Sequence, residues 1–76
     1  MRELVEVIAK ALVENPDEVV VNERKEGRNI ILELHVAPSD MGKVIGRQGR
    51  IAKAIRSVVK AASTRENLKV DVEIKD

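Results

Sequence analysis

Two stretches with a two-residue period, separated by a long segment with helical periodicity, constrain the fold of this chain more than any other feature. In residues 29–37 and again in residues 67–75, an apolar side chain occupies every second position, with mostly charged or polar residues between. That period is typical of strands that bury one face. Because a helical crossover joins strands that lie parallel, the pattern predicts two adjacent parallel strands. Since each strand has only one apolar face, we expect helices on one side of the sheet.

The N-terminal third predicts a helix followed by the first strand of a hairpin. Apolar residues recur at helical spacing from Glu3 to Glu14, and Asn15-Pro16 ends that helix because the residue before a proline avoids helical geometry. The β-branched stretch 18–24 predicts a strand. A turn at Gly27 then joins it to the strand of residues 29–37, which forms a hairpin.

The segment between the two alternating runs predicts two helices. Pro38 ends the strand, and Ser39 or Asp40 is suited to cap a short helix that runs from near Met41 to Gly46. A second helix is predicted from Arg50 to about Ser63, with apolar residues Ile51, Ala54, Ile55, Val58, Val59 and Ala62 on one face. We therefore expect a single α+β domain over residues 1–76, ordered helix-strand-strand-helix-helix-strand, with a three-stranded mixed sheet and three helices on one face.

Composition limits the classes of protein and of site. Seventy-six residues, of which 43% are apolar, suit one small core. The chain has no cysteine, which excludes disulfides, thiolate metal sites and a cysteine nucleophile. Charged residues interrupt the first sixteen positions, so a signal peptide or membrane span is not expected there. These features favour a soluble, cytoplasmic protein.

Charge is distributed very unevenly along the chain. Residues 41–65 contain seven basic residues and no acidic one, whereas the remaining residues sum to −6. Such a separation attracts polyanions to one region of the surface. The plainer alternative is a solvated helix face that happens to be basic.

The stretch Gly46-Arg47-Gln48-Gly49 lies inside this basic segment. Gly46 is suited to a left-handed conformation that ends the first helix, and Gly49 to the entry of the second. Unpaired N–H groups at the start of the second helix would then form an anion site. In the alternative interpretation, the glycines are only a helix cap and a turn. In the first interpretation the rim carries Lys43, Arg47 and Arg50, with Gln48 as a neutral hydrogen-bonding group.

These motifs carry a resemblance to a known family. The segment MGKVIGRQGRIAKAIRSVVKAA resembles the core of a KH domain, with GRQG as its GxxG loop. The helix and strand that precede this core resemble the type II arrangement. Because the likeness covers essentially the whole chain, the protein resembles the small bacterial single-KH RNA-binding proteins of the KhpA family.

The resemblance implies a groove for about four nucleotides of single-stranded RNA, clamped by the GxxG loop. It implies an apolar floor from exposed parts of Val44, Ile45 and Ile51, with the central strand near residues 30–34 as the other wall. The lack of aromatic residues argues against recognition by aromatic stacking. The RNA-binding residues expected from the resemblance are Lys43, Val44, Ile45, Gly46, Arg47, Gln48, Gly49, Arg50, Ile51 and Lys53.

The same resemblance implies partners and a cellular role. Members of the KhpA family are expected to act as homodimers, or as heterodimers with a larger RNA-binding protein of the KhpB type, also called Jag or EloR. The cellular role that the resemblance implies is RNA chaperoning in post-transcriptional regulation, linked to cell elongation and cell-wall homeostasis. No cofactor or metal is implied.

Two other classes of function compete with RNA binding. An enzyme is disfavoured because His35 is the only histidine, no Walker A pattern is present, and the glycine spacing GxxxGxxG does not suit a dinucleotide site. A KH-fold interaction module is the stronger alternative, in which Lys53, Arg56 and Lys60 bind an acidic protein. Single-stranded DNA is a further ligand that type II grooves accept.

Overall fold

A computed structural model describes residues 1–75, and the side chains of Arg47 and Gln48 lie outside the described part. The chain forms helices and strands in the predicted order. The elements are α1 (Arg2–Leu12), the short 3-10 helix η1 (Pro16–Glu18), β1 (Val20–Glu26), β2 (Asn29–His35), α2 (Pro38–Arg65) and β3 (Lys69–Lys75).

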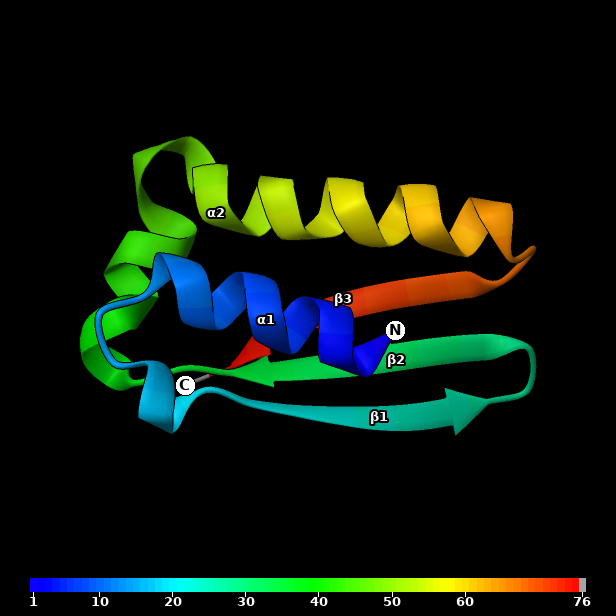
Figure 1. The fold of residues 1–76 in the computed structure, drawn as a ribbon, viewed down its shortest axis with the longest axis horizontal. Coiled ribbons are helices and arrows are strands. Elements are labelled where there is room, and N and C mark those ends of the chain that lie inside the picture. The colour runs from blue at the N-terminus through cyan, green and yellow to red at the C-terminus, as the bar shows by residue number, and fades with distance from the viewer. Residues whose placement is uncertain (76) are drawn as a thin grey trace.

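The sheet has the order β1-β2-β3, with β2 in the centre (Figure 1). β1 pairs antiparallel with β2 through a tight hairpin, and β2 pairs parallel with β3. In the parallel pair, Leu32 lies opposite Val72 and Leu34 opposite Ile74. The predicted mixed sheet is therefore confirmed, and the crossover through α2 makes β3 an edge strand.

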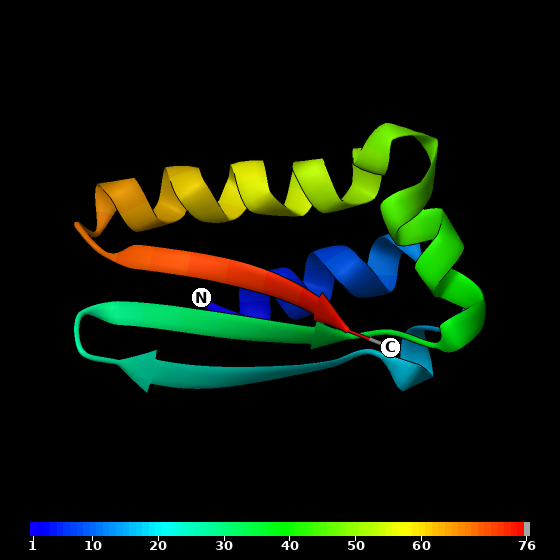
Figure 2. The ribbon, with the colours of Figure 1, turned by 180° about the vertical axis from the view of Figure 1, so that it is seen from behind.

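Both long helices cover the same face of the sheet. Figure 1 shows α1 in front of the strands, and Figure 2, from behind, shows the strands in front of α1. Leu32 and Leu34 of the central strand are fully buried beneath the helices. They share one core with residues of both helices and of the outer strands, namely Val5, Ala9, Val21, Ala52, Ile55, Val59 and Val72. The predicted two-layer α+β fold is confirmed.

Several boundaries differ from those predicted. β1 begins at Val20 instead of residue 18, because Pro16–Glu18 form a 3-10 turn that begins at the proline. The helix after β2 begins at Pro38 itself, where a proline needs no N–H partner, instead of near Met41. The two predicted helices also form one element, α2, which bends within the glycine stretch (Figure 1).

Asp40 was one of two residues predicted to cap the helix, but its side chain does not cap α2. It instead connects α2 to the residues that follow α1. Its buried carboxylate accepts hydrogen bonds from the backbone N–H groups of Glu14 and Asn15 and from Asn15 Nδ2, each at 3.1 Å. Burial alone raises the pKa of Asp40, but these hydrogen bonds and nearby Lys43 outweigh it and hold the pKa below its ordinary value. The interaction fixes the first arm of α2, which precedes the glycine stretch, against the loop that follows α1; the second arm follows that stretch.

Candidate nucleic-acid interface

The bend in α2 is centred on one glycine. Gly49 has φ +64°, in the left-handed region, whereas Gly46 does not have a positive φ. The expectation that Gly46 takes the left-handed conformation is therefore wrong. Figures 1 and 2 show the two arms of α2 running in different directions on either side of the bend.

The bend also bears on the predicted anion site. Helical structure is assigned from Pro38 to Arg65, but the left-handed Gly49 interrupts its regular geometry, so the second arm of α2 begins at the bend. The anion site expected from N–H groups at the start of that arm stays a prediction. Basic side chains beside the bend add positive potential there.

The space beside both glycines is open. Apart from the adjacent residues and the nearby helix backbone, a Cβ atom added at Gly46 or Gly49 would meet no described atom within 4 Å. The protein's own packing therefore does not require a glycine at either position, although the backbone conformation of Gly49 does. An external chain has room to approach the backbone here.

A shallow depression of about 220 Å³ lies between the second arm of α2 and β3. Gly49 and the exposed side chain of Ile45 line it from α2, and Ile74 lines it from β3. We call this depression the bend groove; its lining residues are Ile45, Gly49, Ala52, Lys53, Arg56 and Ile74.

The identity of the far wall corrects a sequence expectation. Residues 30–34 of β2 were expected to form it, but β2 is the central strand and Leu32 and Leu34 are fully buried. The parallel crossover places β3 at the edge of the sheet, under the second arm of α2. Ile74 is therefore a groove residue that sequence reasoning missed, because strand order is a tertiary property.

The expected apolar floor is only partly present. Ile45 is 53% exposed and borders the bend groove. Val44 is completely buried in the core, which contradicts the expectation that part of it faces a ligand. Ile51 is half-buried and packs against the core.

The remaining predicted residues divide between two sides of the bend. Lys53 borders the bend groove. Lys43, Gly46 and Arg50 line a separate depression next to Glu14, together with Ile51, and Lys43 Nζ lies 3.4 Å from the Glu14 carboxylate. Arg47 and Gln48 belong to the bend, but their side chains lie outside the described residues.

The charged residues that line the bend groove, Lys53 and Arg56, are both cations, and further basic residues lie near it on α2. Among the residues that the structure describes, no ion pair involves Arg50, Lys53 or Lys60. Arg56 donates from Nη2 to the backbone oxygen of Val72 at 3.4 Å, which links α2 to β3. Arg56 was predicted only as part of a basic stripe; its position between α2 and β3 follows from the crossover.

Other kinds of site are not found in the described part of the chain. No group of three or more histidine, cysteine, aspartate or glutamate residues there is arranged to hold a metal ion. Within residues 1–75, no helix combines the length and apolar character needed to cross a membrane.

Comparison with known proteins identifies relatives along nearly the whole chain. A family model described as KhpA/KhpB, KH domain, matches residues 2–74. The chain is 68% identical over 74 residues to the RNA-binding protein KhpA of Clostridium perfringens, covering 97% of this chain and 99% of that protein. The corresponding proteins of Clostridium acetobutylicum and Aquifex aeolicus are 65% and 42% identical, each covering 97% of this chain and 99% and 94% of theirs. No solved structure gave a significant match.

Proposed function

Because the chain belongs to the KhpA/KhpB family of KH domains, we propose that it binds single-stranded RNA in the bend groove. One observation carries this proposal. An open glycine bend lies directly beside a groove whose charged side chains, Lys53 and Arg56, are both cationic. A sugar-phosphate backbone requires this combination of close approach and positive charge.

In this proposal, different parts of the groove hold different parts of the RNA. The phosphates pass Gly49, which has no side chain of its own, and interact with Lys53. The bases lie on the aliphatic surface of Ile45, Ala52 and Ile74. With few phosphate contacts and no aromatic stacking, the affinity of one domain for RNA is about 10⁻⁴ to 10⁻⁶ M and falls steeply with salt. The protein acts through binding and carries no catalytic step.

Weak binding by one domain favours assembly, because pairing raises avidity without new contacts. We propose that the protein forms homodimers, and heterodimers with a KhpB (Jag/EloR)-type protein. Exposed apolar residues on the second arm of α2, at helical spacing, support an interface there. This α2 stripe consists of Ala54, Val58 and Ala61.

The proposed cellular role goes beyond RNA binding and assembly. We propose that the protein is a cytoplasmic RNA chaperone in post-transcriptional regulation, and that it contributes to cell elongation and cell-wall homeostasis. The support for this role is family membership alone.

The binding proposal is tested by reversing charge at the bend. The double variant Arg47→Asp/Gln48→Asp places two carboxylates there and changes the net charge by −3. We expect its affinity for single-stranded RNA, measured by fluorescence anisotropy at several salt concentrations, to fall at least about tenfold. Circular dichroism and thermal melting establish that the variant is folded.

A matched control separates local from general charge effects. Lys10→Glu/Asn22→Asp also changes the net charge by −3, but on α1 and β1, away from the bend groove. We expect a much smaller loss of affinity. Equal RNA affinity in the wild type and the Arg47/Gln48 variant would overturn the proposal. If the wild type and the Arg47/Gln48 variant both fail to bind RNA, yet both recover the same acidic protein partner, the interaction-module alternative is correct.

A further inference from the structure

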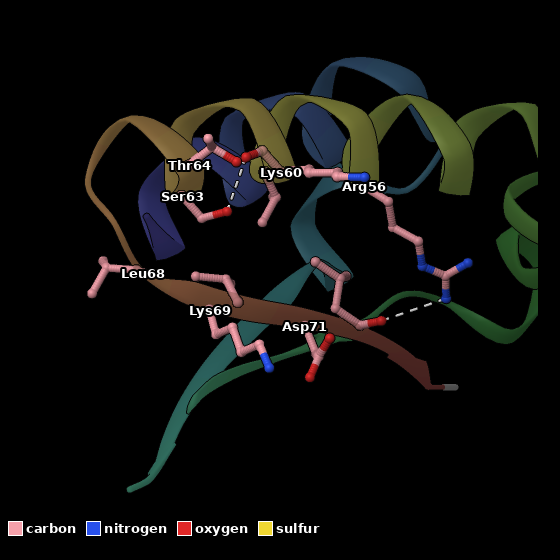
Figure 3. A pocket seen from close by; sticks show the side chains of 10 residues that line it. Arg56, Lys60, Ser63, Thr64, Leu68, Lys69 and Asp71 are labelled. Atoms are coloured by element: carbon pink, nitrogen blue, oxygen red, sulfur yellow. Dashed lines mark hydrogen bonds between the residues drawn. The ribbon is translucent and has the colours of Figure 1, made fainter. Parts of the chain in front are cut away.

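A second depression lies beyond the bend groove, along the same helix and strand. Arg56 lines the bend groove, and it also lines a second and larger depression farther along α2 and β3. Figure 3 shows this second depression, with Arg56 reaching from α2 towards β3. We call it the distal groove; Lys60 and Thr64 of α2 and Leu68 and Lys69 near the start of β3 lie along it. The two depressions share Arg56 as a lining residue, and its side chain reaches Val72 of β3.

Charge in the distal groove favours a polyanion. Lys60 lines the distal groove from α2. Lys69 lines it from β3 and extends on the side of the strand away from α2 (Figure 3). Asp71 is the acidic residue that lines this groove. Beyond Lys69, Arg28 of the β1–β2 turn joins Lys69 in a further depression. Cations therefore continue from Lys53 to the hairpin end of the molecule.

The length and the floor of the distal groove also suit an extended chain. From Gly49 to Thr64 the helix advances about 22 Å, and β3 runs beneath it as an edge strand. Leu68, which is 40% exposed, supplies apolar surface at the far end. A strand held at the bend can therefore continue along the same pair of elements.

We propose that single-stranded RNA bound at the bend continues through the distal groove, with phosphates at Lys60 and Lys69. The site then holds more nucleotides than the four of the clamp. This inference rests on the proposed function, because the same strand occupies both grooves. RNA is favoured over an acidic peptide because the distal groove shares Arg56 with the bend groove and is lined by cations of both α2 and β3.

The test compares two lengths of RNA. Fluorescently labelled, randomised single-stranded pools of 4 and 10 nucleotides are titrated with wild type, Lys60→Gln/Lys69→Gln and the single control Lys10→Gln. For the 10-nucleotide pool, we expect the slope of log K against log salt to become shallower by about 0.7 for each lysine removed. For the 4-nucleotide pool, we expect this slope to change only as much as the altered net charge requires. The same holds for Lys10→Gln with either pool.

A variant that should strengthen binding guards against effects of misfolding, because a misfolded protein would not bind RNA more tightly. Asp71→Asn removes the acid beside the path, so we expect several-fold tighter binding of the 10-nucleotide pool and unchanged binding of the 4-nucleotide pool. Identical binding of the 10-nucleotide pool by wild type and the double lysine variant would overturn the inference while leaving the clamp intact. It would also be overturned if polyglutamate binding depended on these lysines and 10-nucleotide RNA binding did not. If wild type binds neither pool, the proposed function itself fails.

Discussion

Gly46 and Gly49 are the same residue type three positions apart, yet they occupy different backbone conformations. Gly49 has φ +64° and Gly46 remains within a right-handed helix. The sequence reveals the pair, but it does not distinguish the two backbone conformations. The difference depends on where the first arm of α2 is anchored, and that anchor includes Asp40 in a contact with residues 14 and 15.

Alanine at the two glycines should therefore have opposite effects on stability. At Gly49 alanine meets no clash but must adopt a left-handed conformation, so we expect Gly49→Ala to lower the free energy of unfolding by about 1–2 kcal/mol. Gly46→Ala should raise it by about 0.5–1 kcal/mol, because alanine favours the helix. Urea denaturation of both variants checks this, and equal effects would contradict the assignment of the bend to Gly49.

Val44 and Ile45 provide a second contrast between neighbours. Val44 is fully buried, so we expect Val44→Ala to lower the free energy of unfolding by about 2 kcal/mol. Ile45 is exposed beside the bend groove, so Ile45→Ala should change it by less than about 0.5 kcal/mol and weaken RNA binding. Denaturation and anisotropy together separate the two roles, and a strong loss of stability in Ile45→Ala would show that this side chain is structural.

Among the elements, the strands were easier to predict than the arms of α2. Alternation located β2 and β3 within two residues, because their apolar face is set by a period of two. The start of α2 was misplaced, since Pro38 both ends an extended segment and suits the first helical position. Asp40 also bonds to Glu14 and Asn15 in the loop after α1. These residues precede it by 26 and 25 positions, so no local sequence pattern reveals the link.

The Asp40 link should make stability depend on pH. The pKa of Asp40 is lowered in the folded state, so the unfolded state binds more protons as the pH falls below the ordinary value of 3.8. The stabilisation is present above that pH and is lost as the pH falls through the folded-state pKa. We expect Asp40→Asn to be less stable than wild type at pH 6 and to lose less stability on acidification to pH 3, measured by urea denaturation.

A second carboxylate serves as the comparison. Glu33 lies on the outer face of the sheet, 3.0 Å from Lys75 Nζ and 2.6 Å from Arg24 Nη1. The hydrogen bond from Lys75, with the charges of Lys75 and Arg24, lowers the pKa of Glu33 despite partial desolvation. Glu33→Gln should therefore also reduce the loss of stability on acidification, but with a smaller defect at pH 6, because surface ion pairs contribute little. A larger defect in Glu33→Gln than in Asp40→Asn would contradict this order.

For the whole molecule, the crossover converts a pattern of charge along the sequence into a surface. Residues 41–65 contain seven basic residues and no acid, and α2 places Lys53, Arg56 and Lys60 along the edge strand β3. The sequence predicted this basic segment and the glycine loop within it. It did not predict Ile74 as the facing wall, because that position depends on which strand lies at the edge.

Assembly is a second property of the whole molecule. If the α2 stripe forms the homodimer interface, Val58→Glu should shift sedimentation equilibrium towards the monomer while the fold is retained. It should also weaken binding to long RNA through lost avidity. The matched control is Val20→Glu, an exposed valine on β1, which should leave the dimer unchanged. If the control dissociates the dimer and Val58→Glu does not, the interface lies elsewhere.

The most direct test of RNA binding in the bend groove is an NMR titration of the ¹⁵N-labelled protein with a short single-stranded RNA. We expect the largest amide shift changes at Ile45, Gly49 and Lys53 of α2 and at Ile74 of β3. Amides of α1 and β1, such as Val7 and Asn22, should move little. Largest changes on α1 or β1, or no changes at millimolar RNA and low salt, would contradict RNA binding in this groove.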